Sequence, residues 1–117
     1  MYGILEFSNG NYTLQSFSNV KTMDAFARLI VNRAIKQDND GDIEQYLVGW
    51  LDCINECRDG EGEPYVMADV PTQASDNLVY SNAHYYNGRN PLRSDETREL
   101  CNKVESLLEN LIKTLSL

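Results

Sequence analysis

The sequence has no long hydrophobic run, because charged and amide residues interrupt every apolar stretch. A membrane-spanning helix needs about 20 consecutive, mainly apolar residues, so we expect no span and no membrane contact. The N-terminus also lacks the basic leader and apolar run of a secretion signal, since Met1 leads directly into a strand-like pattern. These absences predict a cytoplasmic protein.

Residues that commonly carry chemistry are also scarce: the 117 residues include three cysteines and one histidine. An odd number of cysteines in a chain without an export signal fits reduced thiols better than a disulfide framework. The sequence has no glycine-rich phosphate loop and no serine nucleophile motif. No pair of carboxylates lies in an apolar stretch, where raised pKa values are expected. We therefore predict no enzymatic activity and no cofactor.

Basic residues are outnumbered, and the resulting negative charge is concentrated in one segment. The net charge is −8, and residues 38–63 hold nine acidic residues against one base, Arg58. The rest of the chain is balanced, with nine acids and nine bases. A localised negative field repels nucleic acid and attracts a basic protein surface. This distribution argues against direct nucleic-acid binding and indicates a protein with a basic surface as the partner.

An N-terminal hairpin is predicted by a turn signal between two strand-like segments. Residues 2–7 and 12–17 flank Asn9-Gly10, and Asn-Gly is the strongest short hairpin signal because both central residues of a type I′ turn need positive φ. The register separates an apolar face from a mixed one. The opposed residues are Phe7 and Tyr12, Leu5 and Leu14, Glu6 and Thr13, and Ile4 and Gln15.

Apolar residues recur at helical spacing in three further segments, over about residues 23–37, 42–57 and 95–115. Each segment follows a residue suited to N-capping, namely Thr22, Asp42 or Ser94. Strands are expected over residues 65–70 and near residues 78–81. We therefore predict a single α+β domain over residues 1–117, with an antiparallel three- to four-stranded sheet packed by three α-helices in the order β-β-α-α-β-(β)-α.

The acidic segment gives the strongest functional signal. Asp52 and Glu56 lie four positions apart on the helix face opposite Trp50, and an acidic loop follows. Such a surface can engage the Arg and Lys side chains with which a partner holds phosphates. The competing interpretation is a solvated charged face without a partner. The predicted partner-binding residues are Asp42, Glu44, Asp52, Glu56, Asp59, Glu61 and Glu63.

The predicted function is that of a non-enzymatic binding protein that inhibits its partner by occupying a basic, nucleic-acid-binding surface. Small acidic inhibitors of this kind are known among bacteriophage counter-defence proteins, including anti-CRISPR and anti-restriction factors. The analogy is one of composition alone.

Three alternatives come from other parts of the chain. An aromatic and polar loop predicts a protein that binds or sequesters a small molecule or nucleotide; its residues are Tyr80, His84, Tyr85, Tyr86 and Arg89. A zinc site is conceivable from Cys53, Cys57, His84 and Cys101, although burial of the thiols as small hydrophobes is the simpler interpretation. The apolar stripe of the helix over residues 95–115 is wide enough for homodimerisation in addition to packing.

Overall fold

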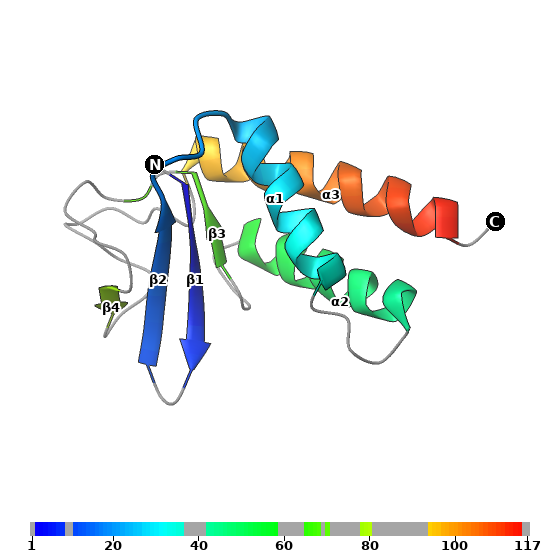
Figure 1. Ribbon diagram of the computed structural model, residues 1–117, viewed down its shortest axis with the longest axis horizontal. Coiled ribbons are helices and arrows are strands. Elements are labelled where there is room, and N and C mark those ends of the chain that lie inside the picture. Colours follow the sequence, from blue (N-terminus) through cyan, green and yellow to red (C-terminus); the bar gives the residue numbers. More distant parts are fainter. Residues whose placement is uncertain are drawn as a thin grey trace.

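Four strands and three helices make up the fold (Figure 1). This computed structural model describes residues 2–8, 11–36, 42–58, 65–68, 70, 78–80 and 94–115. The predicted α+β class, the N-terminal hairpin and the three helices are confirmed. In chain order the elements are β1 (Tyr2–Ser8), β2 (Asn11–Phe17), α1 (Met23–Lys36), α2 (Ile43–Arg58), β3 (Tyr65–Met67), β4 (Leu78–Tyr80) and α3 (Asp95–Leu115).

The sheet is antiparallel throughout and has the strand order β3-β1-β2-β4. The hairpin has the predicted register, with Leu5 opposite Leu14. On the far side of β1, Ile4 is opposite Val66 of β3. The strand predicted over residues 65–70 is shorter than expected, since β3 ends at Met67.

All three predicted N-caps form. The hydroxyl Oγ1 of Thr22 accepts the N–H of Ala25 at 3.1 Å, and Asp42 Oδ1 accepts the N–H of Gln45 at 3.2 Å. At the start of α3, Ser94 Oγ accepts the N–H of Thr97 at 3.1 Å. Each bond satisfies one of the N–H groups that the first turn of a helix leaves unpaired. Local side-chain chemistry therefore fixes where each helix begins.

Helix α1 packs on the hairpin through one aromatic residue. Phe26 is fully buried, stacks on Tyr2 at a centroid distance of 5.1 Å and contacts Phe17 at 5.3 Å. The same side of the sheet holds Gln15, whose Oε1 accepts a hydrogen bond from Arg33 Nη1 at 3.3 Å. The helix thus covers the mixed face of the hairpin.

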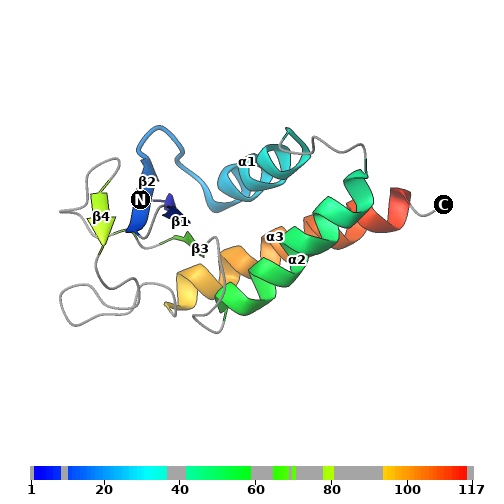
Figure 2. The same ribbon diagram turned by 90° about the horizontal axis from the view of Figure 1, so that it is seen from below.

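The three helices and the sheet enclose one hydrophobic core. Figure 2 shows the strands at one end of the molecule, with α2 and α3 extending side by side toward the other. None of the described helices is both long enough and apolar enough to cross a membrane. The largest fully buried side chains are Phe26, Ile4, Leu5, Ile30, Leu47, Ile54, Met67, Leu100, Leu108 and Val66.

Candidate functional site

The outward side of α2 carries four exposed carboxylates, which we call the acidic face: Asp42, Glu44, Asp52 and Glu56. The opposite side of the helix is buried through Leu47, Trp50, Ile54 and Cys57. Because an α-helix repeats every 3.6 residues, these buried positions turn the acids toward solvent. The predicted exposure of Asp52 and Glu56 opposite Trp50 is therefore confirmed.

No base lies within residues 42–57 to neutralise this face. The next residue, Arg58, is engaged elsewhere, since its Nη2 lies 3.2 Å from Oε2 of Glu105 on α3. Asp52 and Glu56 form no ion pair with any residue that the structure describes. Within the described part of the chain, the two carboxylates thus present their charge to solvent.

The acids of this face differ in how far the fold already uses them. Asp42 caps the helix through its bond to Gln45, and Glu44 also has an interaction within the fold. Changing either residue would therefore alter the fold as well as the surface charge. Asp52 and Glu56 are the two positions at which charge can be altered with the least effect on α2.

Gly49 lies on the exposed side of α2, midway along the chain between Asp42 and Glu56. A Cβ atom built on this glycine meets nothing within 4 Å. Glycine in a helix interior destabilises the fold by about 0.5–1 kcal/mol relative to alanine. Packing within the fold does not require a glycine here, although its missing side chain lets another backbone approach α2 closely.

The other residues predicted for partner or ligand binding have no described geometry. Asp59, Glu61 and Glu63 lie outside the described residues, as do His84, Tyr85, Tyr86 and Arg89. Tyr80 is the exception, since its backbone ends β4 opposite Tyr12 of β2. The acidic face of α2 is therefore the part of the predicted site that has a structure.

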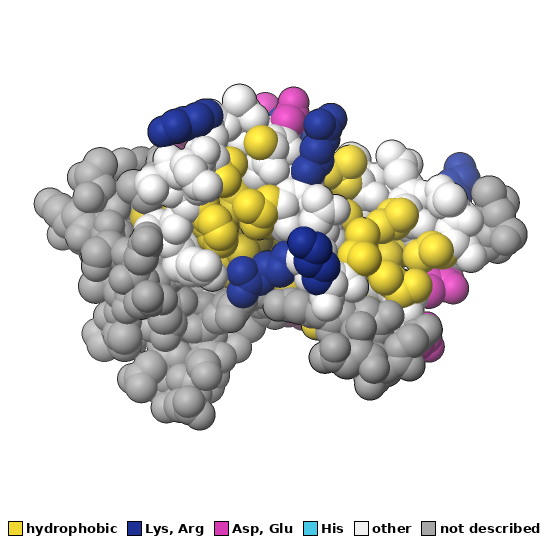
Figure 3. Space-filling model, viewed as in Figure 1, with side chains coloured by type: hydrophobic (Ala, Val, Ile, Leu, Met, Phe, Trp, Pro, Cys, Tyr) yellow, Lys and Arg dark blue, Asp and Glu magenta, His cyan; other side chains and the backbone are white. Residues whose placement is uncertain are grey.

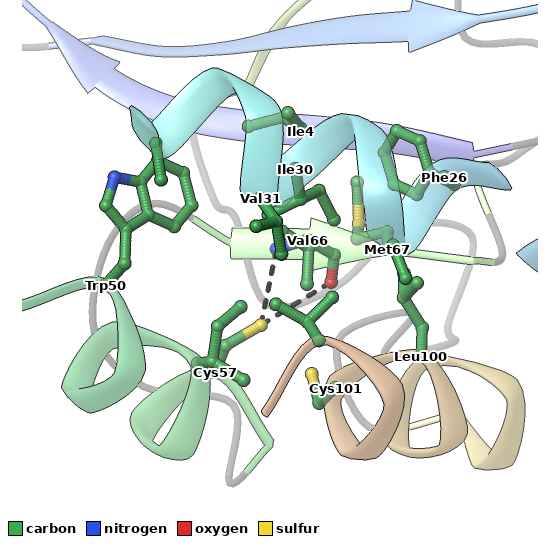
Figure 4. Close-up of a cluster of buried hydrophobic side chains, with 14 of the residues drawn as sticks. Ile4, Phe26, Ile30, Val31, Trp50, Cys57, Val66, Met67, Leu100 and Cys101 are labelled. Atoms are coloured by element: carbon green, nitrogen blue, oxygen red, sulfur yellow. Dashed lines mark hydrogen bonds between the residues drawn. The ribbon is translucent and has the colours of Figure 1, made fainter. Parts of the chain in front are cut away.

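Two of the three cysteines meet in the core. Cys57 of α2 and Cys101 of α3 are fully buried, and their thiols lie close together (Figure 4). The Cys57 thiol accepts the Val66 N–H at 3.3 Å and donates to the Val66 carbonyl at 3.4 Å. Contact with Cys101, together with burial, raises the pKa of Cys57. A protonated, buried thiol is a poor nucleophile, so Cys57 has a structural role.

The cysteine geometry also bears on the conceivable zinc set. Cys53 is half-buried, whereas His84 lies outside the described residues. Among the residues that are described, no group of three or more His, Cys, Asp or Glu side chains is placed to hold a metal ion. Four protein ligands are typical of structural zinc, and the described residues bring only Cys57 and Cys101 together.

Sequence analysis missed a second charged surface, which lies on α1. Residues 21–36 contain four bases and one acid, Asp24. Oδ1 of this acid lies 2.9 Å from Nζ of Lys103 on α3, and the charge of Asp24 also acts on Arg28. Figure 3 shows Lys and Arg side chains gathered over α1, beside apolar ones. We call this surface the basic face; its charged residues are Lys21, Arg28, Arg33 and Lys36.

Comparison with known proteins found no matching protein-family model, no matching curated protein and no matching solved structure. Residue roles therefore cannot be transferred from relatives. The function proposed below rests on the geometry and charge of α2.

Proposed function

We propose that this protein is a non-enzymatic binding protein whose acidic face docks on a basic surface of a partner protein. The observation that carries the proposal is a set of exposed acids, with no base among them, on a helix that is anchored in the core. Asp52 and Glu56 of this set make no ion pair within the described residues. Carboxylates held on a rigid element form charge-assisted bonds to Arg and Lys without first losing partners of their own.

The shape of the acidic face favours a macromolecular partner over a small ligand. From Asp42 to Glu56 the acids extend along about 21 Å of helix. They lie on the convex surface of α2, whereas small-molecule sites are concave and enclose most of the ligand. An acidic face of this length can lie along a flat or grooved protein surface.

The sign of the charge favours a partner surface that normally holds nucleic acid. Such surfaces gather Arg and Lys side chains to bind phosphates, and the same side chains can bind a row of carboxylates. Occupation of that surface would exclude the nucleic acid and so inhibit the partner. We propose that the protein belongs to this class of inhibitors, which includes the phage counter-defence proteins that act against CRISPR or restriction systems.

The test is capture of partner proteins by three immobilised proteins: wild type, Asp52→Lys/Glu56→Lys, and Glu109→Lys. Glu109 is an exposed acid of α3 and serves as the control for a change in net charge. We expect wild type and control to retain the same proteins, which heparin or high salt releases because both compete for basic surfaces. The α2 variant should lose them. Equal capture by all three proteins would contradict the proposal.

A further inference from the structure

The basic face of α1 combines cationic side chains with small and apolar ones. Arg28, Asn32 and Lys36 are exposed along its outward side. A shallow groove follows this side, lined by Ala25, Arg28, Leu29, Asn32, Arg33 and Lys36. Small and apolar side chains thus lie between the cationic ones. A helix with acids on one side can place its carboxylates beside these cations while its backbone lies close to Ala25.

The acidic face of α2 has the complementary charge and length. Its four acids have no base among them, whereas the four bases within residues 21–36 outnumber the one acid, Asp24, which pairs with Lys103 and also acts on Arg28. Helix α1 has 14 residues and α2 has 16, which correspond to about 21 and 24 Å. Gly49 lies near the middle of α2 and presents no side chain to a helix laid across it.

We propose that a second copy of this chain docks the acidic face of its α2 on the basic face of α1. Because two different surfaces meet, two copies related by a two-fold axis can form the contact twice, whereas copies arranged head to tail form it once and build rings or open chains. The contact occupies the acidic face that docks, so that face cannot bind a basic partner at the same time.

The net charge of −8 opposes association of two copies, but it acts over longer distances than the contact. At physiological salt the Debye length is about 8 Å, so charges spread over the two molecules are largely screened from one another. Charges in the contact itself approach within a few ångströms and are screened less. Association should therefore be measured at physiological salt, and it should weaken at about 1 M salt, where the Debye length is about 3 Å.

Reciprocal charge reversal tests the pairing directly. One variant carries Arg28→Glu/Lys36→Glu, which cancels the charge of the basic face and leaves the acidic face intact. The other carries Asp52→Lys/Glu56→Lys, which cancels the charge of the acidic face and leaves the basic face intact. Sedimentation velocity of each variant alone should show association at least about tenfold weaker than that of wild type. An equimolar mixture should regain association, because each variant then offers a complementary face to the other. Misfolding cannot produce this recovery.

Controls are Lys113→Glu and Glu109→Lys on α3, each of which reverses one charge away from both faces and should associate like wild type. The proposal is overturned if wild type stays monomeric at concentrations up to about 1 mM. It is equally overturned if the mixture fails to regain association. Association that survives both reversals but is lost in Leu115→Glu would place the contact on α3, where Leu115 is 42% exposed.

Discussion

At the scale of single residues, Cys57 joins α2 to the sheet. Its thiol makes the two hydrogen bonds that a neighbouring strand would make, since it accepts from the N–H of Val66 and donates to the Val66 carbonyl. Both backbone groups are buried, and a buried polar group without a partner destabilises a fold by about 1–3 kcal/mol. One sulfur atom therefore joins α2 to the sheet and satisfies two groups.

Replacing this thiol should destabilise the fold. We expect Cys57→Ala to lower the free energy of unfolding by about 2–4 kcal/mol, because it leaves the Val66 groups unpaired and opens a small cavity. Urea denaturation measures the loss. Cys53→Ala, at a half-buried position on the same helix, is the control and should lose less than half as much. A loss below about 0.5 kcal/mol in Cys57→Ala would show that the thiol bonds contribute nothing.

The ion pair between Asp24 and Lys103 gives the fold a pH-dependent tie between α1 and α3. The hydrogen bond and charge of Lys103 lower the pKa of Asp24 below 3.8, and Asp24 raises the pKa of Lys103 above 10.5. A carboxylate with a lowered pKa stabilises the fold above its unfolded pKa and loses that effect as pH falls through the folded value. For the lysine, the stabilisation is lost as pH rises through its raised pKa.

We therefore expect Lys103→Gln to melt below wild type at neutral pH. The difference in melting temperature should shrink as pH falls from 3.8 through the lowered pKa of Asp24, at which the carboxyl of the folded protein becomes protonated. It should also shrink at high salt, because the pair is exposed and screened. Thermal melts of the two proteins between pH 2 and pH 8 measure it. A difference that stays constant over this range would mean that the ion pair is not its cause.

At the scale of elements, side chains from two helices bind the backbone at the edge of the sheet that β3 forms. Cys57 of α2 pairs with Val66, and Thr97 Oγ1 of α3 accepts the N–H of Ala68 at 3.1 Å. An open edge strand invites pairing with another chain, and these side chains use the groups that such pairing needs. The edge of β3 is therefore a poor site for pairing with another chain.

The same contacts explain why the sequence did not predict the end of β3 correctly. The hairpin register and the caps at Thr22, Asp42 and Ser94 depend on neighbouring residues, so local patterns predicted them. The end of β3 depends on Thr97, which lies 29 residues from Ala68 in the chain. No local pattern shows that this hydroxyl takes a strand N–H, and the predicted strand was therefore too long.

Gly49 allows a test in which stability and binding change in opposite directions. We expect Gly49→Ala to raise the free energy of unfolding by about 0.5–1 kcal/mol, because alanine is the better helix former and has free space. It should also weaken capture of the basic partner, since the new methyl group lies on the acidic face.

Denaturation and capture assays on the same protein samples measure the two effects. Asn110→Ala, at an exposed position of α3, is the control: it should also stabilise its helix while leaving capture unchanged. If Gly49→Ala captured the partner as well as wild type, the close approach at this position would be ruled out.

At the scale of the whole molecule, the charge is arranged as two helix faces of opposite sign, the acidic face of α2 and the basic face of α1. The net value of −8 conceals this arrangement, because a count outside residues 38–63 gives nine acids and nine bases. In the structure the bases of α1 lie together on one surface, beside apolar side chains (Figure 3). A protein with two such faces can bind a basic partner and a second copy of itself by the same electrostatic rule.

Sequence patterns predicted half of this arrangement. The exposure of Asp52 and Glu56 follows from helical periodicity, which fixes the side of α2 that the core covers. The basic face was detectable from the four bases within residues 21–36. It was missed because the count of nine acids and nine bases outside residues 38–63 does not show which of these charges share a surface. Only the folded molecule shows which charges remain unpaired.

The central claim is that the acidic face of α2 is the surface that binds a basic partner. The most direct measurement is the affinity of wild type, Asp52→Lys/Glu56→Lys and Glu109→Lys for a captured partner, by calorimetry at low and high salt. We predict at least about a 100-fold loss for the α2 variant, no loss for the control, and weaker wild-type binding at high salt. Equal affinity of all three proteins, independent of salt, would contradict the claim.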